Sequence, residues 1–285
     1  MPCPLRGCND KTKMKNNEMR KQKVLDLLLE RKRLTIEEAM KETGVSESTV
    51  RRIFLGLERE GVAIRTYGGI CCRGFDEPIN EYSFEAVSLD NPEKKARIGV
   101  EAEKLIAAGD TVYLDSGTTV MSLCAEIDRL FRAAKSDSDS ENSLAARYGG
   151  VTFFTHSLVN FNLLKHHTKV FLLGGEYRDA RRDFCGYLTE EAVGGLRFTK
   201  CFVGADGFSE DSGLLASDFG TARINRLVVD RSGYRILLVD ASKYRRGAMV
   251  CYAPFGSIDC IVADASLPEP ICASLTRNGV KLILA

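Results

Sequence analysis

The feature that most constrains the fold is a series of short apolar segments, most of them separated by helical patterns, between residue 93 and the C-terminus. The segments are nearly continuous in Val, Ile, Leu and Phe, and they lie at 111–114, 151–154, 169–173, 201–204, 235–239, 260–263 and 280–284. Strands that are buried on both faces of a sheet have this composition, whereas a strand with one wet face alternates apolar and polar residues. Because strands and helices alternate, residues 93–285 are predicted to form a doubly wound, mostly parallel α/β domain.

The first part of the chain carries a different pattern. Apolar residues recur with helical spacing over 18–31, and Thr35-Ile-Glu-Glu38 is a capping box that opens a short second helix. Ser46 follows a Gly-Val turn and caps a third helix, and a β segment follows at 62–70. The core-facing row of the third helix consists of Val50, Phe54 and Leu57. This order predicts a small winged helix-turn-helix domain over residues 18–73.

Charge separates the same two regions. Residues 1–73 hold 16 lysines and arginines against 10 acidic residues, a net charge of +6, although the whole chain carries only +1. The remainder is therefore acidic, with a net charge of −5. A basic module joined to an acidic domain favours binding to nucleic acid through the first part alone.

Three segments of the chain lack a clear apolar pattern. Residues 1–17 are polar and contain two prolines, so they are predicted to be a disordered tail. Residues 74–92 are acidic and contain prolines, which predicts the linker between the two domains. Residues 133–143 are rich in Ser and Asp and are predicted to form a mobile surface insertion.

Membrane, secreted and metal-dependent classes fit the sequence poorly. No apolar run approaches the roughly 18 residues of a membrane span, and the first residues lack the apolar stretch of a signal peptide, so the chain is expected to be cytoplasmic. The ten cysteines are irregularly spaced and form no C-x-x-C pair, so neither structural zinc nor a cofactor is expected. Most of them are interpreted as small buried hydrophobes, with a redox role for Cys71-Cys72 as the alternative.

Several motifs together resemble one family. They are SESTVRRIFLGLEREGVAIRTYGG at 46–69, VYLDSGTTV at 112–120, TKVFLLGGEYR at 168–178 and ILLVDASKY at 236–244. In order and spacing they resemble the DeoR family of transcriptional regulators over nearly all of residues 19–285. The resemblance implies a winged helix-turn-helix that binds operator DNA. It also implies a larger domain, similar to a non-catalytic relative of ribose-5-phosphate isomerase, that senses a phosphorylated sugar, and a repressor of carbohydrate-metabolism genes.

The chain departs from the family pattern at two places. The family has Arg-Arg-Asp-Leu in the recognition helix, where this chain has Arg51-Arg52-Ile53-Phe54. An apolar Ile53 is thus expected near the DNA-facing edge, which affects the operator sequence more than DNA binding itself. The family also carries Glu-Ala before a late helix, where this chain has Thr221-Ala222, so the ligand chemistry is expected to differ.

The predicted DNA interface combines hydroxyl groups with long cations. Hydroxyls at the start of a recognition helix can bond phosphates or base edges, and arginines can bond guanine or phosphate in a bidentate manner. Residues of the wing can contact phosphate or the minor groove. The predicted DNA-binding residues are Ser46, Ser48, Thr49, Arg51, Arg52, Arg65 and Tyr67. Because one recognition helix reads few base pairs, a homo-oligomer on a repeated operator is expected.

The predicted effector site lies where the parallel strands end, since ligands of open α/β sheets bind at the carboxyl ends of the strands. Asp115-Ser116-Gly117-Thr118-Thr119 combines hydroxyls with a helix start, which suits a phosphate. Other strand ends add Gly174, Gly175, Asp206, Asp240 and Lys243, with the lysine as a cationic partner. Arg178, Arg181 and Arg182 are either anion contacts or a solvated loop, and His156 is interpreted as a structural hydrogen-bonding residue.

Two other functions remain open from the residues alone. One is a sugar-phosphate isomerase with Asp206, Asp240 and Lys243 as acid, base and electrostatic partner. Thr221 stands where a glutamate base would be sought, and a fused DNA module suits an isomerase poorly, so catalysis is not expected. The other is a DNA-binding regulator that needs no ligand.

Overall fold

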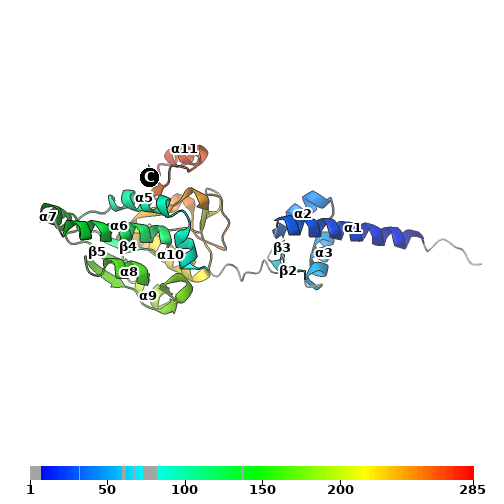
Figure 1. The fold of residues 1–285 in the computed structure, drawn as a ribbon, viewed down its shortest axis with the longest axis horizontal. Coiled ribbons are helices and arrows are strands. Elements are labelled where there is room, and N and C mark those ends of the chain that lie inside the picture. Colours follow the sequence, from blue (N-terminus) through cyan, green and yellow to red (C-terminus); the bar gives the residue numbers. More distant parts are fainter. Residues whose placement is uncertain (1–7, 32, 60–61, 67–68, 73–81, 136–137) are drawn as a thin grey trace, which may run out of the picture. The chain divides into compact units, whose positions relative to one another are not determined.

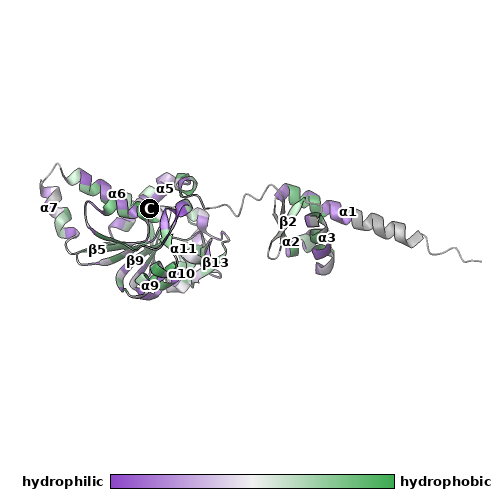
Figure 2. Cartoon of the chain, turned by 90° about the horizontal axis from the view of Figure 1, so that it is seen from below, coloured by the Kyte–Doolittle hydropathy of each residue, from purple (hydrophilic) through white to green (hydrophobic). Residues whose placement is uncertain are grey.

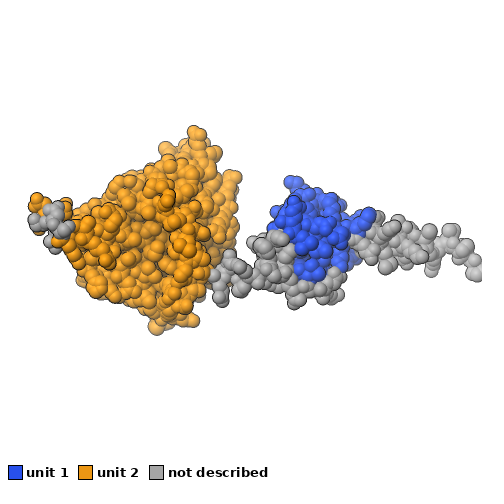
Figure 3. Space-filling model, viewed as in Figure 1, with its two compact units in different colours: residues 1–81 blue, residues 82–285 orange. Residues whose placement is uncertain are grey.

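The computed structural model describes residues 8–31, 33–59, 62–66, 69–72, 82–135 and 138–285. The chain divides into two compact units, residues 1–81 and 82–285 (Figure 3). We call them the helix-turn-helix unit and the sensor unit. The boundary lies inside the predicted linker. Among the described residues, no helix is long and apolar enough to span a membrane.

The helix-turn-helix unit contains three helices and a small antiparallel sheet (Figure 1). Its elements are α1 (Cys8–Arg31), β1 (Arg33–Thr35), α2 (Ile36–Thr43), α3 (Glu47–Arg59), β2 (Ala63–Thr66) and β3 (Gly69–Cys72). The predicted capping box is confirmed, because the Thr35 hydroxyl accepts from the Glu38 amide at 3.1 Å and the Glu38 carboxylate accepts from the Thr35 amide at 2.8 Å. Gly44 ends α2 in the left-handed conformation, with φ of 67°, which glycine adopts at little cost. The hairpin of β2 and β3 is the predicted wing.

Two predictions for this unit need correction. Helix α1 begins at Cys8, so residues 8–17 are not a disordered tail. Apolar periodicity is not required there, since a helix nucleated over 18–31 can extend into neighbouring residues without the cost of a new nucleus. Ile53 does not face DNA, because its side chain is 8% exposed and packs in the same core as Val50 and Leu57. Positions three and four residues apart share one face of a helix.

The sensor unit is built on a seven-stranded sheet in the order β15-β14-β12-β9-β4-β5-β6, and every adjacent pair is parallel. These strands are β4 (Thr111–Leu114), β5 (Thr152–Thr155), β6 (Lys169–Leu172), β9 (Phe198–Val203), β12 (Ser232–Val239), β14 (Cys260–Ala263) and β15 (Lys281–Leu284). The predicted doubly wound sheet is therefore confirmed. Short antiparallel strands that the sequence pattern missed are β7 (Glu176–Arg178), β8 (Asp183–Cys185), β10 (Gly207–Ser209), β11 (Gly213–Ala216) and β13 (Val250–Ala253).

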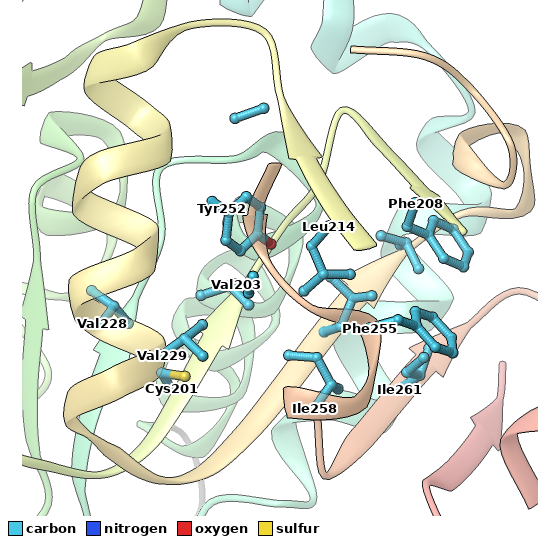
Figure 4. Close-up of a cluster of buried hydrophobic side chains, with 14 of the residues drawn as sticks. Cys201, Val203, Phe208, Leu214, Val228, Val229, Tyr252, Phe255, Ile258 and Ile261 are labelled. Atoms are coloured by element: carbon cyan, nitrogen blue, oxygen red, sulfur yellow. The ribbon is translucent and has the colours of Figure 1, made fainter. Parts of the chain in front are cut away.

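Helices cover both faces of this sheet (Figure 1). They are α4 (Phe84–Leu89), α5 (Pro92–Glu103), α6 (Thr118–Ala134), α7 (Ser138–Arg147), α8 (Leu158–Leu164), α9 (Tyr187–Gly194), α10 (Phe219–Arg231) and α11 (Glu269–Arg277). Side chains of α5, α6 and α8 pack in one core with Val112, Leu114 and Phe202. The other core contains side chains of α9, α10 and α11 together with strand side chains, among them Cys201 and Val203 of β9 (Figure 4). Helices such as α6 carry both hydrophobic and hydrophilic residues along their length (Figure 2).

Two predicted loops are helical. Residues 83–89 belong to the sensor unit, because Ser83 caps α4 and Phe84 is buried, so only the earlier part of the predicted linker remains, and residues 73–81 lie outside the described residues. The predicted mobile insertion at 133–143 contains the end of α6 and the start of α7. Leu144 and Tyr148 pack on the sheet core four residues apart, which holds α7 in place despite its polar composition.

Candidate functional site

The first turn of α3 presents a cluster of hydroxyl groups. Ser46 Oγ lies 3.1 Å from both Ser48 Oγ and Thr49 Oγ1, and the two serines are exposed. The Ser46 carbonyl accepts from the Thr49 and Val50 amides at 2.9 and 3.0 Å, so the helix begins directly after it. The three predicted hydroxyl residues thus share one exposed helix start, which matches the requirements for DNA contact.

Arg51 and Arg52 lie one turn further along α3 and are both exposed. Arg51 pairs with Glu47 at 2.7 Å, an exposed i,i+4 contact that is weak and can be exchanged for a phosphate. Arg65 lies on β2 of the wing, but its side chain lies outside the described residues, as does Tyr67 altogether.

A cavity of about 40 Å³ lies where three adjacent strands of the sensor unit end. The loop after β4 contributes residues 115–119, the loop after β9 contributes residues 204–206, and Lys243 follows β12. Seven of the ten predicted effector residues line this cavity. They are Asp115, Ser116, Gly117, Thr118, Thr119, Asp206 and Lys243.

The start of α6 forms one wall of this cavity, and no side chain of its N-cap residue caps it. Gly117 is the N-cap residue and supplies no side-chain hydrogen bond, and the first amides of a helix have no partner within the helix. The buried Thr118 and Thr119 follow directly. The Ser116 hydroxyl donates to Asp183 Oδ2 at 2.7 Å and thereby holds the loop, so its predicted contact with the effector stays a prediction.

Asp115 ties two strand ends together. Its carboxylate accepts from the Ser116 amide at 2.7 Å, the Gly204 amide at 2.9 Å and Asn225 Nδ2 at 3.2 Å. Burial raises the pKa of this carboxyl group, while His156 and these three donors act in the opposite direction. Asp115 therefore shapes the cavity through its hydrogen bonds.

Two cations and one further carboxylate face the cavity. The Lys243 side chain is 8% exposed, and no hydrogen bond or ion pair to its Nζ is found among the described residues. Burial lowers the pKa of Lys243, and Arg246 lowers it further, whereas Asp240 and Asp206 raise it. Arg181 lies 2.9 Å from Asp218 and 3.9 Å from Asp206. The Asp206 carboxylate accepts from the amide and the hydroxyl of Ser217, both at 2.7 Å.

Three predicted effector residues do not line the cavity. Gly174 and Gly175 follow β6, two strands away from β4 at the edge of the sheet. A Cβ on Gly175 would lie 2.1 Å from Thr189 Oγ1 and 2.5 Å from the Cys185 carbonyl oxygen, so this glycine allows close packing of the chain. Asp240 is buried and accepts from the Ser242 amide at 3.0 Å and from Asn91 Nδ2 at 3.3 Å.

Behind the cavity lies a buried polar network around Asp183. Arg178 donates to both Asp183 oxygens at 2.8 Å, and Asp183 is fully buried. His156 is also fully buried, with Nδ1 2.6 Å from the Tyr113 hydroxyl and Nε2 3.6 Å from Asp183. Burial lowers the pKa of His156, against the effect of Asp183. His156 is therefore hydrogen-bonded inside the protein, as its predicted structural role requires. Arg182 pairs with Glu85 at 2.7 Å.

Among the polar residues that line the cavity, sequence reasoning missed Tyr82 and Asn225, whereas Arg181 was one of the possible anion contacts and Thr221 the position expected to change the ligand chemistry. Asn225 Oδ1 is buried and has no hydrogen-bond partner among the described residues, so it is an open acceptor. Neither Tyr82 nor Asn225 follows a strand of the parallel sheet or belongs to a recognisable motif, so the sequence did not predict that they line the cavity.

These features define a class: a winged helix-turn-helix unit joined to a doubly wound α/β sensor unit with a polar cavity at the strand ends. Residues 20–72 match the DeoR-like helix-turn-helix domain, and residues 142–265 match the DeoR C-terminal sensor domain. The chain belongs to the DeoR family of transcriptional regulators.

Two relatives named as repressors agree with this assignment. The chain is 30% identical to the lactose phosphotransferase system repressor of Lactococcus lactis, over 87% of this chain and 91% of that protein. It is 24% identical to the glycerol-3-phosphate regulon repressor of Escherichia coli K12, over 92% and 96% of the two chains. A ribose 5-phosphate isomerase A structure from Methanocaldococcus jannaschii aligns with a TM-score of 0.37 and 19% identity, over 54% of this chain and 55% of that one.

Proposed function

We propose that this protein is a repressor of carbohydrate-metabolism genes that binds operator DNA through α3 and the wing and is released by a phosphorylated sugar. The relatives named for a lactose phosphotransferase system and for a glycerol-3-phosphate regulon support an effector of this class. The protein is proposed to act in the cytoplasm as a homo-oligomer, since two recognition helices read a longer operator than one.

The observation that carries the effector assignment is the cavity at the start of α6. The open amides of Thr118 and Thr119 suit a phosphate, because a helix N-terminus carries partial positive charge and free donors. Lys243 faces the same cavity without a protein partner among the described residues, and it would supply a charge-assisted bond to the phosphate. Asn225 Oδ1 and Asp206 would accept from sugar hydroxyls. The site therefore offers donors for an anion beside acceptors for a polyol.

An isomerase function has weaker support. It would need Asp206, Asp240 and Lys243 around one substrate, but Asp240 does not line the cavity. Thr221, at the position considered for a base, is hydrogen-bonded to Asp218. Incubation with ribose 5-phosphate is expected to yield no ketose product.

A ligand panel tests the sensor function. Ribose 5-phosphate, glucose 6-phosphate, fructose 6-phosphate and glycerol 3-phosphate are added to the full chain, with the unphosphorylated compounds as controls. A ligand at 100 times its dissociation constant stabilises the folded state by about 2.7 kcal/mol. For a unit of this size, that raises the melting temperature by roughly 5–10 °C. If no phosphorylated compound raises it more than its unphosphorylated control, the regulator needs no ligand of this class.

The DNA interface is tested with Arg52→Ala. The exposed guanidinium is expected to contact DNA, so its loss should weaken binding to a DNA site selected from a random pool by about 1–3 kcal/mol if it contacts a base. Arg277→Ala, an exposed arginine of α11 in the sensor unit, is the matched control and should leave the affinity unchanged. Equal affinities of Arg52→Ala and wild type in a gel-shift titration would contradict this role.

A further inference from the structure

The strongest unassigned feature is the aromatic ring at the entrance of the sensor unit. Tyr82 is its first residue, and its side chain lines the proposed effector cavity together with Asp115 and Asp206. The Arg181 guanidinium lies 3.9 Å from the centre of the Tyr82 ring, close enough for a cation–π contact. Burial raises the pKa of the Tyr82 hydroxyl, and the carboxylates of Asp206 and Asp115 raise it further. Tyr82 therefore lines the cavity beside these carboxylates and against Arg181.

The remaining space is too small for a sugar phosphate. Small-molecule sites in proteins measure about 300–1,000 Å³, whereas this cavity holds about 40 Å³. Tyr82 and Arg181 line the same small cavity as the start of α6 and Asn225, so a phosphate and a sugar placed there would need additional space. Resting on the effector function proposed above, we propose that Tyr82 occupies the effector site in the ligand-free protein and that the effector displaces it.

The segment that carries Tyr82 is placed to transmit this displacement. Residues 82–91 bridge the two loops that hold the cations of the cavity. At one end Tyr82 contacts Arg181 and Glu85 pairs with Arg182 at 2.7 Å, and at the other end Asn91 Nδ2 donates to Asp240, three residues before Lys243. In the chain this segment is the first described part of the sensor unit after the helix-turn-helix unit, so the covalent chain at Tyr82 is the connection on which a displaced Tyr82 would act.

There is also space into which α4 can move. Val87 lines the cavity, while Phe84, Glu85, Ser88 and Leu89 line a separate groove of about 550 Å³ against α8 and Tyr177. Helix α4 therefore forms a wall between the small cavity and the larger groove. A ligand that pushes on Tyr82 and Val87 meets a short helix with open space on its other side.

The proposal predicts opposite effects of Tyr82→Ala on two measured quantities. Removal of the competing ring should tighten effector binding about tenfold or more. The apparent affinity of the wild type is reduced by the fraction of molecules in which Tyr82 occupies the site, and the variant has no such fraction. The effector should also no longer release the operator from this variant. It is expected to lower the operator affinity of the wild type by about 5–150-fold, the usual range of allosteric coupling. For Tyr82→Ala the expected reduction is less than about twofold. Tyr82→Phe keeps the ring and should behave as wild type, as should Tyr187→Ala, an aromatic that is 73% exposed.

The experiment uses the full chain, the panel sugar phosphate that stabilises it most, calorimetry for effector binding and fluorescence anisotropy for operator binding. Weaker effector binding by Tyr82→Ala, or unchanged coupling, would overturn the proposal while leaving the effector function intact. A wild-type protein that binds no panel member would overturn the effector function itself and this proposal with it. The chain contains no tryptophan, so Tyr82→Trp adds a single reporter. Its emission should shift to longer wavelength on effector binding, and an unchanged spectrum would count against displacement.

Discussion

Asp183→Ala is expected to lower the free energy of unfolding of the sensor unit by about 3–5 kcal/mol, since it removes the fully buried partner of Arg178 and leaves that guanidinium paired only with the less buried Asp218. The same change removes the acceptor of the Ser116 hydroxyl and the nearest carboxylate to His156 Nε2. For a unit of about 200 residues this corresponds to a fall in the melting temperature of roughly 6–20 °C, measured by calorimetry on the full chain.

Asp179→Ala is the matched control for this prediction. Asp179 lies four residues earlier and pairs with Arg182 at 3.5 Å, but its side chain is 83% exposed. Exposed ion pairs contribute about 0–1 kcal/mol, so this variant should melt close to the wild type. If Asp183→Ala has the same melting temperature as Asp179→Ala, the polar network around Asp183 does not stabilise the sensor unit.

Lys243→Ala is expected to weaken binding of the sugar phosphate by about 1.5–3 kcal/mol, the contribution of a hydrogen bond to a charged group. The effect should be large because Lys243 is buried at the cavity and its Nζ has no hydrogen-bond or ion-pair partner among the described residues. Thr118→Val keeps the shape of the side chain and should cost about 0.5–1.5 kcal/mol through loss of one hydroxyl. Both changes in binding free energy are to be measured by calorimetry with the panel sugar phosphate that stabilises the chain most.

Lys104→Ala provides the comparison for Lys243→Ala. Its side chain is 57% exposed and pairs with Glu101 within α5, so its loss should leave the dissociation constant of the sugar phosphate unchanged. If Lys243→Ala and Thr118→Val both bind as tightly as this control, the phosphate lies elsewhere in the molecule.

The parallel sheet could be predicted from the sequence because each of its central strands is buried on both faces and is nearly continuous in apolar residues. The strands β7 and β8 could not, since each has three residues, and Glu176, Arg178 and Asp183 among them are charged. Their pairing depends on the antiparallel register between two segments and not on any local apolar pattern.

The cavity was predictable in part for the same reason. Strand order places the ends of β4, β9 and β12 side by side, so the polar residues after them come together. The prediction for Gly174 and Gly175 used the same rule, but it could not show that β6 is at the edge of the sheet. The role of Tyr82 could not be predicted, because a single aromatic residue in an acidic segment forms no periodic pattern. Its partner Arg181 is also about a hundred residues away along the chain.

A phosphorylated sugar bound in the sensor unit is proposed to control DNA binding by the helix-turn-helix unit. This control is tested by the operator affinity of the full wild-type chain, measured by fluorescence anisotropy on a DNA site selected from a random pool, with and without the panel sugar phosphate that stabilises it most. Binding is expected to be tight without the sugar phosphate, and the affinity is expected to fall by about 5–150-fold when the sugar phosphate is saturating. An operator affinity that is the same with and without the bound ligand would show that the sensor unit does not control DNA binding in this way.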